Sequence, residues 1–116
     1  MIDWKRLTAL AQLDELIELS ASKAVGIFKH SSRCFTSFSV KKFLEDRWSI
    51  PEEVVELYFL DLIEYRDISD AIAQKFSVTH QSPQLIVVRE GKVIYDDSHH
   101  KISVEQLENE LGLIQE

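Results

Sequence analysis

The sequence predicts one α/β domain: a four-stranded mixed sheet with helices on both faces, in the order αβαβαββα. Three observations support this prediction. Short apolar runs alternate with segments of helical periodicity, and only Glu90-Gly91 separates the last two runs, as in a hairpin. The 116 residues are 45% hydrophobic, which is enough material for one core. We therefore expect a single domain over residues 1–116 with no linker.

The first half of the chain is expected to form two helices and two strands. Leucines at helical spacing, with acidic residues between them, predict an amphipathic helix over residues 6–20. Ala24–Phe28 is short and apolar, as expected for a central strand, and Cys34–Arg47 has the pattern of the helix that follows. Pro51 offers a start signal for a second strand, because Val54–Leu60 is rich in β-branched and aromatic residues.

The second half is expected to form a helix, a hairpin and a final helix. Ser69–Phe76 has one apolar helical face. Pro83–Arg89 and Lys92–Tyr95 flank the glycine turn and predict two antiparallel strands. Ser103-Val-Glu-Gln106 has the form of a capping box, which opens a last helix ending near Leu113.

Composition and charge exclude several classes of function. The formal charge of −7 and the absence of a Lys/Arg stripe disfavour nucleic-acid binding. No apolar run approaches the roughly 20 residues that a membrane-spanning helix needs. The start, Met1-Ile-Asp-Trp-Lys5, lacks the features of a signal peptide, and a single cysteine fits a reducing compartment. We expect a cytoplasmic monomer that binds neither nucleic acid nor membrane.

Cys34, the only cysteine, lies where the first apolar strand pattern gives way to a helix. Unpaired N–H groups in the first turn of a helix carry partial positive charge and stabilise a thiolate, the reactive form of the side chain. Ser37 stands three residues later, where a Cys-x-x-Cys motif has its resolving cysteine. The pattern therefore predicts a monothiol nucleophile. The alternative is a buried structural cysteine, since free cysteine is among the most buried residue types.

The neighbours of Cys34 suggest supporting roles. Ser37 either donates its hydroxyl proton to the thiolate or caps the helix locally. Arg33 either balances the charge of the thiolate or of an acidic group on a small thiol, or is a solvated surface residue. Lys29 and His30 are further candidates for stabilising the thiolate. A cysteine protease is disfavoured, because contact between His30 and Cys34 is not assured and no orienting partner is identifiable.

A second motif, Ser82-Pro83, precedes the apolar run Gln84–Val88. Proline lacks the N–H that a central ladder requires, so it is tolerated at the first residue of a strand, and X-Pro bonds adopt the cis form far more often than others. Strand, Cys-x-x-Ser, helix and then Pro-strand is the order seen in the thioredoxin fold. In that fold, a cis-proline loop lies beside the active cysteine and offers backbone groups to an extended substrate.

Lys29-His-Ser-Ser-Arg-Cys34 with Ser37, followed by Ser82-Pro83-Gln-Leu-Ile-Val, resembles the monothiol bacilliredoxins of the bacillithiol system (YtxJ-type). The resemblance covers nearly the whole chain. One departure is Phe35-Thr36, where family members tend to have Pro-Ile. The dipeptide at this place tunes the reactivity of the thiol and the docking surface.

The resemblance implies thiol–disulfide exchange in redox homeostasis and the stress response. A single thiol cannot form an intramolecular disulfide, but it can accept one half of a mixed disulfide. We expect Cys34 to take a small thiol from S-thiolated cytosolic proteins, with bacillithiol as co-substrate and no bound cofactor. The predicted catalytic residues are Cys34 and Ser37, and the predicted substrate-binding residues are Arg33, Phe35, Thr36, Ser82 and Pro83.

Two other functions remain open at this level. An iron–sulfur cluster carrier like the monothiol glutaredoxins would use one cysteine from each of two chains, although the glycines typical of that class are replaced here by Phe35 and Asp96–His100. A non-catalytic thioredoxin-like binding module is the other. His99-His100 lacks further ligands at useful spacing, so no metal site is predicted. No feature distinguishes bacillithiol from glutathione or coenzyme A.

Overall fold

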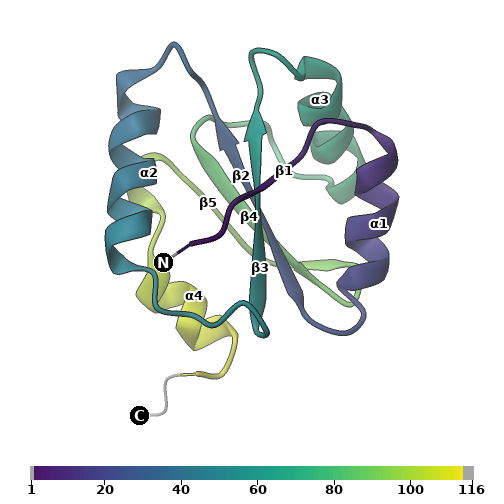
Figure 1. The fold of residues 1–116 in the computed structure, drawn as a ribbon, viewed down its shortest axis with the longest axis vertical. Helices are drawn as coiled ribbons and strands as arrows, with labels where there is room; N and C mark the ends of the chain where they lie inside the picture. The colour runs from purple at the N-terminus through teal and green to yellow at the C-terminus, as the bar shows by residue number, and fades with distance from the viewer. Residues whose placement is uncertain (1, 114–116) are drawn as a thin grey trace.

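The computed structural model describes residues 2–113. A five-stranded sheet in the order β1-β3-β2-β4-β5 forms its centre (Figure 1). The strands β1–β3 and β3–β2 pair in parallel, whereas β2–β4 and β4–β5 are antiparallel. In chain order the elements are β1 (Lys5–Arg6), α1 (Ala11–Leu19), β2 (Ala24–His30), α2 (Phe35–Arg47), β3 (Val55–Asp61), α3 (Arg66–Phe76), β4 (Gln84–Arg89), β5 (Lys92–Ser98), the 3₁₀ turn η1 (His99–Lys101) and α4 (Val104–Glu110).

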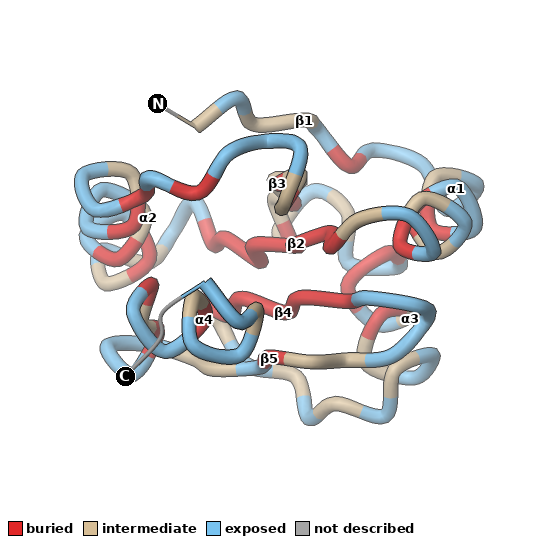
Figure 2. Tube along the Cα trace, turned by 90° about the horizontal axis from the view of Figure 1, so that it is seen from below, coloured by how far each residue is buried: buried red, intermediate tan, exposed pale blue. Residues whose placement is uncertain are grey.

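Two apolar cores lie on opposite faces of the sheet. Helices α2 and α4 cover one face, and α1 and α3 cover the other (Figure 2). Because side chains alternate along a strand, Phe28 of β2 packs with Leu44 of α2, while its neighbour Ile27 packs with Ile72 of α3. Every residue of β2 is buried, as expected for a strand with neighbours on both sides and helices on both faces.

The close packing at the centre requires one glycine. A Cβ atom on Gly26 would lie 2.5 Å from Cδ2 of Leu57 in the neighbouring strand β3. A side chain at this position would therefore require the end of the Leu57 side chain to move. Gly26 therefore leaves the space beside β2 that the Leu57 side chain fills.

The prediction of a four-stranded sheet was wrong by one strand, and the predicted helix over 6–20 begins later. Residues Lys5–Arg6 form the edge strand β1, and the N–H of Leu7 extends the pairing by donating to the carbonyl of Phe59 at 3.0 Å. The Gln12 side chain accepts hydrogen bonds from the N–H groups of Thr8 and Ala9, which fixes the bend before α1. Leu7 is buried through this strand and not through the helical face that its spacing suggested.

The remaining elements match the prediction in type, with shifted ends. Strand β2 continues to His30, β5 continues to Ser98, α3 begins at Arg66, and α4 ends at Glu110. The capping box is only half formed. The Ser103 hydroxyl accepts from the N–H of Gln106 at 3.1 Å, but the N–H of Ser103 donates to the Tyr95 hydroxyl at 2.8 Å. Within residues 2–113, no helix is long and apolar enough to cross a membrane.

Candidate active site

Cys34 is the N-cap residue of α2, in an extended conformation, and is partly exposed. The loop that delivers it is a tight turn. The N–H of Cys34 donates to the carbonyl of Ser31 at 3.1 Å, and the N–H of Arg33 donates to the Ser31 hydroxyl at 3.3 Å. These contacts fix the Cys34 backbone directly after the end of β2.

The first turn of α2 leaves polar groups free near the sulfur. The carbonyl of Cys34 accepts from the N–H groups of Ser37 and Phe38, at 3.1 and 3.4 Å. The Cys34 side chain makes no capping hydrogen bond. The N–H groups of Phe35 and Thr36 precede the first intrahelical bonds, so they have no acceptor within the helix. Cys34 therefore occupies the N-cap position, at the positive end of the helix dipole and next to two backbone donors that are free within the helix.

Ser37 lies behind Cys34 and is fully buried. Its hydroxyl oxygen accepts from the N–H of Ser31 at 3.1 Å and lies 2.6 Å from Nδ1 of His30. This differs from both predicted roles of Ser37, donation to the thiolate and local capping of the helix. Ser37 instead links the first turn of α2 to the end of β2, and its contacts with Ser31 and His30 fix the two ends of the Cys34 loop relative to each other.

The ring of His30 is buried among aromatic rings. Its centroid is 4.5 Å from that of Phe38 and 5.2 Å from that of Phe59. Burial lowers the pKa of His30, and the positive charge of Lys41 acts in the same direction, against Asp61. The direction of the Ser37–His30 hydrogen bond follows the tautomer: with the ring proton on Nε2, Nδ1 accepts from the Ser37 hydroxyl, and with the ring proton on Nδ1, His30 donates to the Ser37 oxygen.

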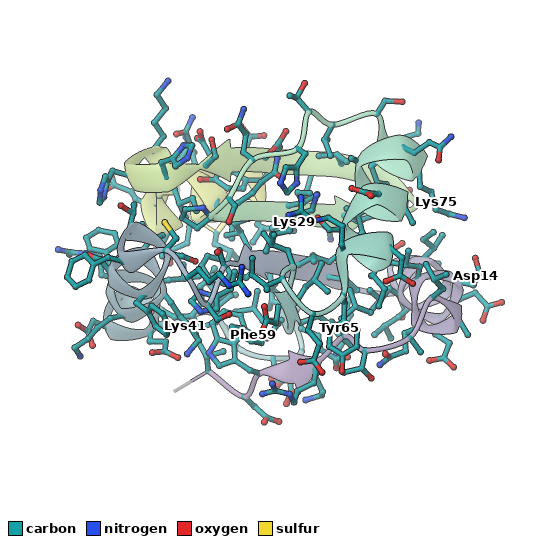
Figure 3. The ribbon with its side chains drawn as sticks, turned by 90° about the horizontal axis from the view of Figure 1, so that it is seen from above. Asp14, Lys29, Lys41, Phe59, Tyr65 and Lys75 are labelled. Carbon is teal, nitrogen blue, oxygen red and sulfur yellow. The ribbon has the colours of Figure 1, made fainter. Side chains whose placement is uncertain are left out.

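Lys29, the preceding residue, points to the opposite face of the sheet, toward α3 (Figure 3). It is fully buried, and its Nζ donates to the carbonyl of Ser69 at 3.1 Å and lies 3.3 Å from Nδ1 of His80. Burial lowers the pKa of Lys29 from 10.5 to about 8, against the attraction of Asp70 and Asp96. The expectation that Lys29 and His30 stabilise the thiolate is therefore not met, since the side chains of both residues are hydrogen-bonded to other partners.

The loop before β4 forms the second side of the site. The Ser82-Pro83 peptide bond is cis, and the carbonyl of Pro83 accepts from the N–H of His99 at 2.9 Å. Gln84 anchors the loop through its side-chain amide, which donates to the carbonyl of Thr79 and to Asp96. The Ser82 hydroxyl is buried without a hydrogen-bond partner among the described residues. An unpaired buried polar group beside a candidate site is a feature that requires a physical reason.

The other predicted substrate-binding residues lie around the cysteine. Phe35 is 86% exposed, which is unusual for a large apolar side chain and places a free aromatic surface next to Cys34. Arg33 is exposed and Thr36 is half-buried. No hydrogen bond or ion pair of the Arg33 guanidinium is found within the described part of the chain. No group of three or more potential metal ligands occurs among residues 2–113.

A groove between α2 and the turn after β5 escaped the sequence prediction. Its first part is a cavity of about 240 Å³, and its second part is a cavity of about 290 Å³. Phe43, His100 and Ile102 line both parts, so the two are continuous. No local pattern could have revealed it, because its two walls are more than fifty residues apart in the sequence.

Solved structures with the same fold support the assignment of the fold. One, described as having a thioredoxin fold, is 31% identical, with a TM-score of 0.73 and 91% of each chain covered. Mala s 13, a thioredoxin of Malassezia sympodialis, is 16% identical over 97% of this chain and 90% of its own, with a TM-score of 0.70. Thioredoxin O2 of Arabidopsis thaliana is 15% identical over 97% and 95%, with a TM-score of 0.66. The fold is thioredoxin-like, as predicted.

The family follows from a second comparison. Residues 5–107 match the model of the monothiol bacilliredoxin family BrxC. The chain belongs to this family, which confirms the resemblance drawn from the Lys29–Cys34 and Ser82–Val87 motifs. Family and fold together support thiol–disulfide exchange as the chemistry of the protein.

Proposed function

We propose that the protein removes bacillithiol from mixed disulfides on cytoplasmic proteins through a mixed-disulfide intermediate on Cys34. The observation that carries this proposal is the placement of a single, partly exposed thiol at the start of α2, with the buried Ser37 hydroxyl where a resolving thiol would stand. A protein with this arrangement exchanges one small thiol at a time. The proposed role is in redox homeostasis during thiol stress.

The first step is attack by the Cys34 thiolate on the bacillithiol sulfur of the substrate disulfide. A Cys34–bacillithiol disulfide forms, the substrate disulfide breaks, and the substrate cysteine leaves as a thiolate. In the second step, a free bacillithiol thiolate attacks this intermediate, so that Cys34 leaves as a thiolate and bacillithiol disulfide is released. In the net reaction the substrate cysteine is reduced and the free bacillithiol is oxidised, while the bacillithiol taken from the substrate stays at the disulfide level and leaves as half of bacillithiol disulfide.

Ser37 supports this cycle because its hydroxyl cannot resolve the disulfide between Cys34 and bacillithiol. Its oxygen is held by the N–H of Ser31 and by His30, and an alcohol does not displace a thiolate from a disulfide. The Cys34–bacillithiol disulfide therefore persists until a second small thiol arrives. The unpaired Ser82 hydroxyl and the exposed Phe35 ring are the proposed contacts for the small thiol and for the substrate protein.

A turnover assay tests the proposal. A test protein carrying a bacillithiol mixed disulfide is incubated with catalytic amounts of this protein and an excess of free bacillithiol, and bacillithiol disulfide is quantified. We expect removal of bacillithiol from the test protein to require both this protein and free bacillithiol. We expect Cys34→Ser to have no activity. Circular dichroism of Cys34→Ser controls for folding. Removal of bacillithiol from the test protein at the same rate with Cys34→Ser would refute the proposal.

Two further measurements, made beside the turnover assay, separate the proposal from the two other functions considered. A cluster carrier would show charge-transfer absorption after anaerobic reconstitution with iron and sulfide, and would dimerise on loading. A binding module would bind the thiolated test protein without releasing bacillithiol. Either result without turnover would contradict the exchange cycle.

A further inference from the structure

We propose that the groove between α2 and η1 binds an acidic group of the small thiol that Cys34 exchanges. We define the η1 groove by Ser39, Phe43 and Arg47 on α2, and by His99–Ile102 on the other wall. This inference rests on the proposed function and adds a subsite that selects anionic thiols over neutral ones.

The groove starts beside both halves of the candidate site. Ser39 lies five residues after Cys34 on the same helix, which is about 7.5 Å along its axis. The opposite wall begins at His99, whose N–H is bonded to the carbonyl of Pro83. Phe43, which the Arg47 guanidinium covers, lies nine residues after Cys34, about 13.5 Å along the axis, so a molecule with its sulfur at Cys34 reaches the Arg47 end of the groove if its acidic group lies about 13 Å from the sulfur.

The charge in the groove is opposite to that of the protein as a whole. The chain carries a formal charge of −7 with its histidines neutral, yet on the same count the groove carries +1, because Arg47 and Lys101 line its second cavity and Glu105 is the only acidic residue in either cavity. His99, His100 and Lys101 are exposed, so their polar atoms are accessible to a ligand. A cationic groove in an acidic protein concentrates an anionic ligand at that place.

The groove has the composition of a built subsite. Its floor is apolar, with Val40 and Ile102 buried, and the Arg47 guanidinium lies 4.1 Å from the centroid of the Phe43 ring. Stacking on the ring restricts the guanidinium and leaves its edge for a carboxylate or a phosphate. His99 has a positive φ of 55°, a conformation that non-glycine residues rarely adopt. This backbone turn places His99 and His100 on the wall of the groove.

The chemistry therefore points to low-molecular-weight thiols that carry carboxylate or phosphate groups. We would measure second-order rate constants of reduced Cys34 with the disulfides of bacillithiol, glutathione and coenzyme A, which are all anionic. Bis(2-hydroxyethyl) disulfide is the neutral reference. We expect at least one anionic disulfide to react about tenfold faster than the neutral one at low ionic strength, and this preference to shrink as salt is added.

Variants locate the preference in the groove. Arg47→Ala with Lys101→Ala is expected to lower the ratio of the anionic to the neutral rate constant by about tenfold, because charge-assisted hydrogen bonds to the ligand are lost. Arg89→Ala with Lys92→Ala removes the same two residue types from the β4–β5 turn, at the opposite end of β5 from η1, and is expected to keep the ratio.

The possible failures are distinguishable. The subsite would be overturned if all four disulfides reacted with equal rate constants. It would also be overturned if both double variants lowered the ratio of the anionic to the neutral rate constant equally. Either result would leave the exchange cycle intact. A Cys34 that reacts with none of the four would contradict the proposed function itself. Circular dichroism and urea unfolding of each variant verify that a changed ratio comes from a folded protein.

Discussion

Lys29 and His30 are consecutive residues of β2, and each supports a different half of the site. His30 faces α2 and binds the Ser37 hydroxyl, which holds the Cys34 loop. Lys29 faces α3 and contacts His80, in the loop that leads to Ser82-Pro83. Both side chains are buried, both have a lowered pKa, and neither contacts the sulfur through a hydrogen bond found among residues 2–113.

The comparison shows how a strand can order two loops at once. Alternation along β2 sends neighbouring side chains to opposite faces, so one dipeptide at the strand end reaches both loops. The two anchors differ in kind. His30–Ser37 is a neutral hydrogen-bonded pair, whereas Lys29 is an amine buried without a carboxylate within ion-pair distance in the described chain. Burial of such an amine is costly in its charged form.

The largest effect is expected from shortening Lys29. Lys29→Ala removes three methylenes and the amine from a fully buried site and leaves the carbonyl of Ser69 without its partner, at a cost of about 3 kcal/mol in the free energy of unfolding. Lys29→Met keeps most of the volume and removes the charge, so we expect a much smaller loss. Urea unfolding measures both. Equal losses for the two variants would show that the charge, and not the packing, makes Lys29 important.

The pH dependence tests the charge on Lys29. The unfolded lysine keeps its proton up to about pH 10.5, whereas the folded one loses it near pH 8. Between these values the unfolded chain binds more protons, so stability rises with pH. Relative to Lys29→Met, the wild type should gain about 2 kcal/mol between pH 7 and pH 10. Parallel stability curves of the two proteins in urea would contradict a buried, titrating Lys29.

Removing the hydroxyl on the other face tests the neutral anchor. Ser37→Ala leaves Nδ1 of His30 and the N–H of Ser31 unpaired and buried, which should cost about 1 to 2 kcal/mol. The same substitution should make the Cys34 loop more mobile, which would be measured as faster amide hydrogen exchange at Ser31. The matched control is Ser39→Ala, an exposed serine two residues further along α2. If Ser39→Ala were as destabilising, the anchor would be ruled out.

The smallest effect on stability is expected from Phe35. Its side chain is 86% exposed, so Phe35→Ala should change the free energy of unfolding by less than about 0.5 kcal/mol. The rate of exchange with a thiolated protein should nevertheless fall, while that with a small disulfide should change less, because the exposed ring is proposed to contact the substrate protein. Unchanged rates with both would remove Phe35 from the docking surface.

The sequence was sufficient for the order of the main elements and for bringing Cys34 and Ser82-Pro83 to one end of the sheet. Both depend on local signals, namely the apolar runs, the start of a helix and a proline before a strand. Strand β1 was missed because two residues carry no periodicity, and its pairing with β3 is a long-range contact. The cis state of Ser82-Pro83 was equally beyond reach, since the sequence allows either isomer.

The partners of Lys29 and His30 were also missed. Their nearness to Cys34 in the sequence suggested roles at the thiolate, but the structure places Lys29 on the far face and engages His30 with Ser37. The η1 groove likewise depends on how α2 packs against a turn distant in the sequence. Such contacts arise from tertiary packing, which local pattern cannot specify.

The most direct test of the exchange mechanism is a single turnover without free small thiol. Reduced protein is mixed with an equimolar test protein that carries a bacillithiol mixed disulfide, and intact masses of both are followed over time. We predict that this protein gains the mass of one bacillithiol less two hydrogens on Cys34, that the test protein loses its adduct at the same rate, and that Cys34→Ser does neither. A disulfide between the two proteins as the stable product, or no transfer to an alkylatable Cys34, would contradict the exchange mechanism.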